Sequence, residues 1–259
     1  MQHVEREQDS MGPVARFLGR LVFFSLLVTI ALTAIPYGTV QPRWIAIFEC
    51  VVFLIAVLGV IETSISRTWS RNNLTLFAPL LLLTLFITFQ SLPLFSGIGP
   101  LGLGSSLSAD PYGTRLVAIR LFALIVAALL LLRYTSNKAR LRKLIYVIMA
   151  VGLASAFFGI MRKNLQQGSA FFLPGLTIVD RSFGQFVNRN HFAFLMEMCL
   201  ALSLGLIVGE TGRHRRVLVL LAVSALLWVA LIYSNSRGGI LASLCQLLFL
   251  GVMLDPLVT

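Results

Sequence analysis

Residues 116–133 read LVAIRLFALIVAALLLLR, an almost unbroken apolar run with one arginine inside it and one at its end. The hydrocarbon core of a bilayer is about 30 Å thick, and an α-helix needs about 20 apolar residues to cross it. Lipid offers no hydrogen-bond partner to a peptide group, so a spanning segment of this length satisfies its backbone only as a helix. This stretch therefore predicts a transmembrane helix.

Seven further apolar runs of similar length repeat the signal along the chain. Together with the first, they lie at 17–35, 44–62, 74–92, 116–133, 143–160, 192–209, 217–233 and 239–254. These lengths fit helices and exceed the roughly 9–11 residues of a membrane β-strand. We expect an all-α fold: a polytopic transmembrane helical bundle of about eight spans, forming one domain over residues 1–259.

Composition argues against a soluble domain. The chain is 58% hydrophobic and 12% charged, with a mean hydropathy of +0.89, whereas soluble domains carry about 25% charged residues. A net charge of +11 would suggest nucleic-acid binding in a soluble protein. Here the basic residues lie in short gaps between apolar runs, which is the pattern of membrane topology, so we expect no nucleic-acid partner.

Neither the cysteines nor the common motifs indicate metal or nucleotide chemistry. Cys50, Cys199 and Cys245 each lie inside an apolar run without a CxxC pair, and we interpret them as small packing residues. The sequence contains no GxxxxGK[ST], GxGxxG or HExxH motif. We expect no cofactor and no metal.

The distribution of lysine and arginine predicts the orientation, because these residues accumulate in cytoplasmic loops. If the N-terminus is cytoplasmic, 13 of the 21 fall on the cytoplasmic side and the other eight face outward. This division favours a cytoplasmic N-terminus. The outward residues are Arg43, Arg115, Arg120, Arg162, Lys163, Arg181, Arg189 and Arg237.

Four of these outward cations lie in the gap 161–191, which also holds the start of GQFVNRNHFAF at 184–194. One interpretation is a solvated loop that is basic by chance. The other is an outward-facing site for an anion, because arginine offers a permanent charge and a planar fork that matches phosphate oxygens.

Two more outward arginines lie in or at predicted spans, where a charge costs about 2.5–3.5 kcal/mol on insertion scales and often marks a site. Arg120 lies about one turn into its span; it either marks a site or reaches the interface. Arg237 lies in SNSRGG, 234–239, where hydroxyl and amide donors favour a functional role. The two glycines permit close helix packing or backbone approach to a ligand.

Several segments together resemble a known family. They are IPYGTVQPRW at 35–44, LSADPYGTR at 107–115, FVNRNHFAFL at 186–195 and SNSRGG at 234–239. In this order and spacing on a helical frame, the chain resembles, over essentially its whole length, the bacterial O-antigen ligase and O-antigen polymerase superfamily of membrane glycosyltransferases.

The resemblance implies glycan transfer at the outer face of the inner (cytoplasmic) membrane of a bacterium, without metal or nucleotide. The implied partners are an undecaprenyl-pyrophosphate-linked glycan, membrane lipid, and an acceptor glycan or lipid A-core. Breaking the sugar–pyrophosphate bond leaves negative charge on the carrier, which outward cations would stabilise.

The candidate site residues follow from the motifs and from this chemistry. Arg189 and Arg237 match motif positions, and Arg120 and Arg181 are added on physical grounds alone. The expected pyrophosphate-binding set is Arg189, Arg237, Arg120, Arg181, Asn188, Asn190 and Ser236. His191 is the only outward histidine and is either a general base or an interfacial polar residue.

One departure from the family affects the expected activity. Family members usually continue into a long extracytoplasmic loop that carries a histidine, whereas this sequence ends at Thr259. We therefore expect a fragment, or a chain that needs a partner, which inserts into the membrane without transferring glycan by itself. A transporter or flippase and a non-catalytic assembly subunit remain alternatives, as does the choice between ligase and polymerase.

Overall fold

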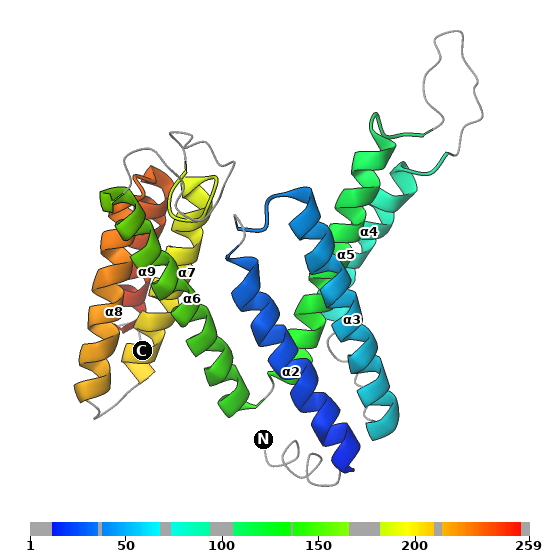
Figure 1. Ribbon diagram of the computed structural model, residues 1–259, viewed down its shortest axis with the longest axis horizontal. Coiled ribbons are helices and arrows are strands. Elements are labelled where there is room, and N and C mark those ends of the chain that lie inside the picture. Colours follow the sequence, from blue (N-terminus) through cyan, green and yellow to red (C-terminus); the bar gives the residue numbers. More distant parts are fainter. Residues whose placement is uncertain are drawn as a thin grey trace. The chain divides into compact units, whose positions relative to one another are not determined.

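The computed structural model is all-helical (Figure 1). It describes residues 12–35, 38–67, 74–93, 106–135, 137–165, 182–209 and 214–254. The helices in these ranges are α2 (Pro13–Thr33), α3 (Pro42–Ser66), α4 (Leu74–Gln90), α5 (Pro111–Tyr134), α6 (Lys138–Leu165), α7 (Arg189–Gly209), α8 (His214–Tyr233) and α9 (Arg237–Leu254). Each of the eight predicted apolar runs corresponds to one of these helices, and the all-α fold class is confirmed.

Six of the helices are long and apolar enough to cross a membrane: α2, α3, α5, α6, α7 and α8. The other two, α4 with 17 residues and α9 with 18, are shorter and also apolar. Large apolar side chains are exposed on the helices, such as Phe17 at 65% and Leu248 at 71%, and a bilayer accommodates them better than water does.

The chain is thus a multi-pass membrane protein. That α4 and α9 also cross the membrane, that the N-terminus is cytoplasmic, and that the membrane is a bacterial inner membrane all stay predictions.

Local sequence explains where several helices begin. Proline is the first residue of α2, α3 and α5, where its fixed φ suits the helix and its missing N–H costs nothing. Asp110, Asn188 and Ser236 each precede a helix and accept a hydrogen bond from a backbone N–H of the first turn, over 2.9, 2.9 and 3.3 Å. These side chains satisfy donors that the helix itself leaves free.

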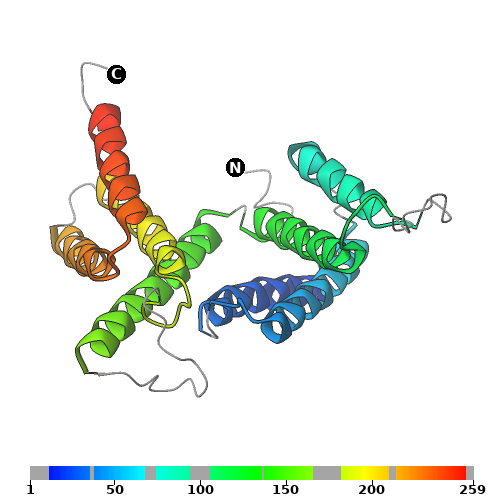
Figure 2. The same ribbon diagram turned by 90° about the horizontal axis from the view of Figure 1, so that it is seen from above.

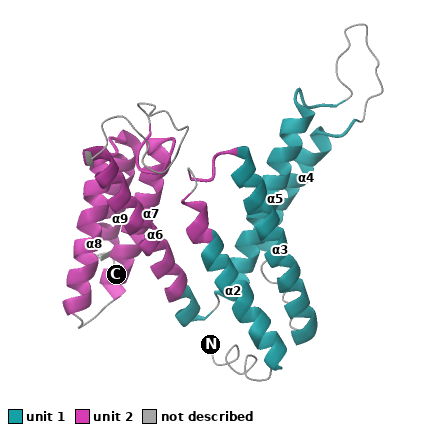
Figure 3. Ribbon diagram, in the orientation of Figure 1, with its two compact units in different colours: residues 1–29, 42–141 teal, residues 30–41, 142–259 magenta. Residues whose placement is uncertain are grey.

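Two compact units divide the chain (Figure 3). Unit 1 comprises residues 1–29 and 42–141, and unit 2 comprises residues 30–41 and 142–259. Unit 1 therefore holds most of α2 with α3, α4 and α5, and unit 2 holds most of α6 with α7, α8 and α9.

In unit 1, α5 packs against both α3 and α4, and it lies beside α4 in two perpendicular views (Figures 1 and 2). A buried polar cluster joins α5 to α3. The hydroxyl of Tyr134 donates to Oε2 of Glu62 over 2.7 Å, and Arg133 donates to the same oxygen over 3.2 Å. Because Glu62 is only 3% exposed, its carboxylate depends on these two partners.

In unit 2, α7 packs against both α8 and α9. The core consists of side chains from α6, α7 and α8 together with two phenylalanines that precede α7. Phe192, Met196 and Leu200 form the α7 part of this core and are almost completely buried. A polar contact also joins α7 to α8: the hydroxyls of Ser203 on α7 and Ser224 on α8 lie 2.7 Å apart and share a hydrogen bond.

The cysteines differ in their surroundings. Cys199 is buried in this core, against Gly152 of α6, where no side chain larger than hydrogen would fit. Its interpretation as a packing residue is confirmed. Cys50 and Cys245 are exposed, so that interpretation was wrong for them; an apolar run does not reveal which of its faces is turned to lipid.

Candidate functional site

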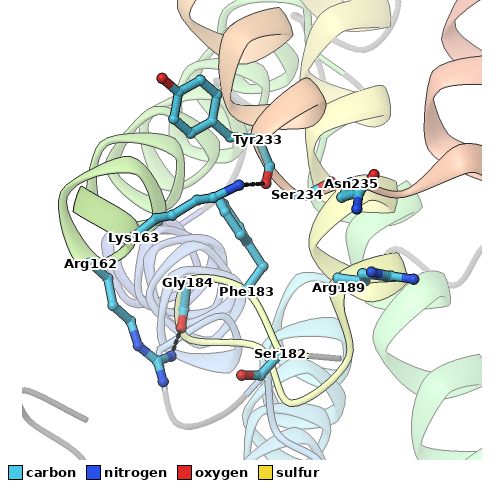
Figure 4. Close-up of a pocket in the computed structure, with 10 residues that line it drawn as sticks. Arg162, Lys163, Ser182, Phe183, Gly184, Arg189, Tyr233, Ser234 and Asn235 are labelled. Carbon is cyan, nitrogen blue, oxygen red and sulfur yellow. Dashed lines mark hydrogen bonds between the residues drawn. The ribbon is translucent and has the colours of Figure 1, made fainter. Parts of the chain in front are cut away.

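A cavity of about 300 Å³ lies at one end of unit 2 (Figure 4). Its walls come from the last turns of α6, the segment before α7, the first residue of α7, and the connection from α8 to α9. The lining residues are Gly159, Arg162, Lys163, Ser182, Phe183, Gly184, Arg189, Tyr233, Ser234 and Asn235. Among these lining residues, which all belong to the described part of the chain, are three cationic side chains and no aspartate or glutamate.

A tight turn before α7 forms one wall. The backbones of Phe183 and Phe186 exchange two hydrogen bonds, of 3.1 and 3.0 Å, and Gly184 between them has a φ of +57°, which glycine adopts at little cost. The ring of Phe183 lies directly on Gly159 of α6, because a Cβ there would be 2.5 Å from the ring. The turn is further held to α6 by Gln185, whose Nε2 donates to Ser155 Oγ over 2.6 Å.

Arg162 connects this turn to α6. Its guanidinium donates to the backbone carbonyl of Gly184, and the residue is only 8% exposed. A guanidinium carries five N–H donors, so the contact leaves others for a ligand. Arg162 therefore combines a structural bond with a charge at the cavity wall.

Lys163 is exposed and spans the cavity toward α8. Its ammonium donates to the backbone carbonyl of Tyr233 over 2.8 Å (Figure 4). The same nitrogen lies 4.9 Å from the centroid of the Tyr233 ring and 5.9 Å from that of Phe183. A carbonyl and two aromatic faces thus hold the ammonium in place without neutralising it.

Arg189, the first residue of α7, is half-buried. Its guanidinium points away from Lys163 in Figure 4, so the cations bound the cavity on different sides. No ion pair to Arg189 occurs among the described residues. Arg162 and Lys163 each donate to a backbone carbonyl, whereas the guanidinium of Arg189 has no hydrogen bond or ion pair among the described residues.

Arg237 and His191 are predicted site residues that lie near the cavity in sequence but do not line it. Arg237 begins α9 and is exposed, two residues after Asn235. His191 is exposed on α7 and stacks on Phe194, with ring centroids 6.4 Å apart. Arg181 lies outside the described residues.

Arg120 belongs to unit 1. Its Nε lies 3.8 Å from Oε1 of Glu49 on α3, and that carboxylate supplies the partner which a charge within a span requires. Neither interpretation of Arg120 from the sequence included this partner.

The polar residues predicted for the site connect helices. Ser236 donates through its hydroxyl to Oδ1 of Asn190 over 2.9 Å, and Asn188 caps α7. The next contacts between α9 and α7 are closer: a Cβ on Gly239 of α9 would lie 2.7 Å from Cβ of Ala193 and 2.9 Å from Oε1 of Glu197, both on α7. Of the two uses that sequence allowed for the glycines, Gly239 serves close helix packing.

From the sequence, Arg162 and Lys163 are expected only as outward cations, the amide of Asn235 is expected only as a donor beside Arg237, and Tyr233 is not expected at the site. The sequence signal for these two cations is the Arg-Lys pair in the last turn of α6. Basic residues in a last turn also interact favourably with the helix dipole, so the pair alone does not indicate a binding site. The partner of Lys163 across the cavity is a backbone carbonyl, which the type of residue at that position does not reveal.

Comparison with protein-family models, curated proteins and solved structures gives no match.

Proposed function

We propose that this protein is a membrane glycosyltransferase of the O-antigen ligase or polymerase type. It takes a glycan from undecaprenyl pyrophosphate and passes it to an acceptor hydroxyl at the outer face of the bacterial inner membrane. The observation that supports this proposal is the cavity of unit 2, which has Arg162, Lys163 and Arg189 in its walls and no acidic residue among the described residues that line it. The motif resemblance supplies the reaction type.

The cavity suits a lipid-linked pyrophosphate for two reasons. It lies at the ends of apolar helices, where the headgroup of a membrane-embedded carrier would reside while its polyprenyl tail stays among apolar side chains. Its arginines and lysine offer several N–H donors to phosphate oxygens, and a charge-assisted hydrogen bond is about twice as strong as a neutral one.

The reaction requires charge stabilisation on the carrier side. A bond forms between the acceptor oxygen and the anomeric carbon, and the bond from that carbon to the pyrophosphate oxygen breaks with its electron pair. The carrier leaves as undecaprenyl pyrophosphate with an added negative charge, which preorganised cations stabilise. The acceptor hydroxyl loses its proton to a base, for which exposed His191, two residues after Arg189, is our candidate.

Binding and turnover of a defined substrate test this proposal. The full chain in lipid nanodiscs is mixed with undecaprenyl pyrophosphate carrying an oligosaccharide and with an acceptor glycan. We expect Lys163→Ala and Arg189→Ala each to weaken substrate binding by about tenfold, the loss of a charge-assisted hydrogen bond. Arg215→Ala is the matched control, because Arg215 is an exposed arginine at the opposite end of α8 from Tyr233.

The outcomes separate the competing functions. Consumption of the donor with formation of a glycosylated acceptor supports the transferase. Movement of the donor across a liposome bilayer without product would indicate a flippase, and binding without either activity would indicate an assembly subunit or a transferase that acts only with a partner. Equal binding by all four proteins would remove the cavity from the function.

A further inference from the structure

The segment Ser234-Asn235-Ser236, which connects α8 to α9, divides its polar groups between structure and cavity. Ser234 is 3% exposed and its hydroxyl donates to the carbonyl of Leu231 over 2.6 Å. Ser236 is 2% exposed and its hydroxyl donates to Asn190. Both serine hydroxyls are therefore engaged within the protein.

Asn235 differs from its two neighbours. It is exposed and lines the cavity, and its carboxamide has no hydrogen-bond partner among the described residues. Only its backbone N–H is engaged, donating to the carbonyl of Ile232 over 3.0 Å. Within this segment, the Asn235 carboxamide is the polar side chain left for a ligand.

The backbone of Asn235 is also unusual, with a φ of +54°. Glycine adopts this left-handed conformation without the steric cost that a Cβ brings, and asparagine is among the few other residues that tolerate it. Helices commonly end on a left-handed residue of this kind, and Asn235 follows the end of α8, so this turn sets where its side chain lies beside the cavity.

Asn235 is two residues along the chain from the carbonyl that holds Lys163, a proposed phosphate-binding residue. The carbonyl that accepts the bond from Lys163 belongs to Tyr233, two residues before Asn235. An ammonium and a neutral carboxamide therefore share one wall of the cavity (Figure 4). Phosphate oxygens accept hydrogen bonds only, whereas a carboxamide both donates and accepts, which matches a sugar hydroxyl or acetamido group.

We propose that Asn235 is a specificity-determining residue that binds the sugar next to the pyrophosphate, through hydrogen bonds from its carboxamide. This inference rests on the proposed function, since it takes the ligand to be a glycan on a pyrophosphate carrier. Lys163 and Arg189 bind the phosphates, and Asn235 distinguishes a carrier with a sugar from one without. A site with a free polar group disfavours a ligand that leaves the group unpaired.

The test compares two probes on the full chain in nanodiscs: undecaprenyl pyrophosphate, and the same carrier bearing one N-acetylhexosamine. We expect the wild-type protein to bind the sugar-bearing probe about fivefold more tightly, the effect of a hydrogen bond or two. Asn235→Gly, which accepts the same backbone conformation, should abolish this preference and leave the Kd for the bare carrier unchanged. Asn235→Asp should weaken binding of the bare carrier, because it sets a carboxylate beside the phosphates.

Arg67→Gly is the matched control, because Arg67 is another non-glycine residue with positive φ, +54°, at the end of a helix. It should retain the sugar preference, which shows that relief of positive φ is not the cause. A wild-type protein that binds the bare carrier without sugar preference, or an Asn235→Gly variant that keeps the preference, overturns this inference and leaves the proposed function standing. Binding of neither probe by the wild-type protein overturns both.

Discussion

The hydroxyl of Ser236 donates a hydrogen bond to Oδ1 of Asn190 over 2.9 Å, across 46 residues of sequence. It joins the first turn of α7 to the residue that caps α9, within unit 2. The two polar motifs of the sequence, one around Asn190 and one around Ser236, are thereby connected directly. The same hydroxyl also accepts the N–H of Gly239, so one side chain both caps α9 and holds it against α7.

Breaking this connection should destabilise unit 2. We expect Ser236→Ala to lower the free energy of unfolding by about 2 kcal/mol, since it removes a helix cap and a side-chain hydrogen bond. Asn190→Ala should cost about 1 kcal/mol, since it removes the bond alone. In an SDS titration, the double variant should cost less than the sum of the two, by about the energy of the shared bond. Strict additivity would mean that the bond contributes nothing.

The two glycines of SRGG should respond differently to substitution. A Cβ on Gly239 would collide with Ala193, Glu197 and Leu231, whereas nothing lies within 4 Å of a Cβ on Gly238. Gly239→Ala should therefore destabilise the fold by about 1–3 kcal/mol, the usual cost of overpacking. Gly238→Ala, its neighbour and control, should leave thermal unfolding in detergent unchanged. Similar melting temperatures for the two variants would contradict the tight α7–α9 contact.

These contacts show what the sequence could and could not predict. Hydrophobic run length predicted all eight helices, because a span must satisfy its own backbone and the signal is local. The exact helix starts were not predicted: α5 begins at Pro111 and α7 at Arg189, ahead of the apolar runs at 116 and 192. The bond from Lys163 to the Tyr233 carbonyl joins residues 70 positions apart and uses a main-chain atom that every residue has, so residue type carries no sign of it.

The site prediction was limited by the same difference. SNSRGG was identified as functional, but its residues separate into roles that only tertiary packing assigns. Ser234 and Ser236 bond within the protein, Gly239 packs against α7, and Asn235 lines the cavity. In unit 1, the sequence predicts a charge within a span at Arg120 but gives no sign that Glu49, also within an apolar run, is its partner.

The buried carboxylate of unit 1 gives a prediction that is independent of the cavity. Tyr134 donates to Glu62 in a buried position, so Tyr134→Phe should leave that carboxylate with one fewer partner and cost about 1–3 kcal/mol of stability. Tyr112→Phe is the control on the same helix, because Tyr112 is 73% exposed. The melting temperature should fall for Tyr134→Phe and not for Tyr112→Phe. An equal change in the two melting temperatures would show that the hydroxyl of Tyr134 is dispensable.

The predicted orientation can be tested by labelling. In a cysteine-free background, Ser106→Cys and Ser182→Cys place thiols in the connections 93–115 and 161–191, and Lys138→Cys places one at the opposite end of the neighbouring helices. Because the charge distribution predicts a cytoplasmic N-terminus, an impermeant thiol reagent added to intact spheroplasts should label the first two and not the third. The reverse pattern would place the cavity on the cytoplasmic side and exclude transfer at the outer face.

Arg162 and Lys163 are adjacent in sequence but should separate stability from binding. Arg162 is buried and donates to the carbonyl of Gly184, so Arg162→Ala leaves a buried acceptor unpaired and should cost about 1–3 kcal/mol. Lys163 is exposed, and water can replace its bond to the carbonyl of Tyr233. Lys163→Ala should therefore have the same melting temperature as the wild-type protein and yet bind undecaprenyl pyrophosphate more weakly. Thermal unfolding and ligand titration of both variants measure the two effects separately. A loss of stability in Lys163→Ala equal to that in Arg162→Ala would make Lys163 a structural residue and leave Arg189 as the principal phosphate-binding cation.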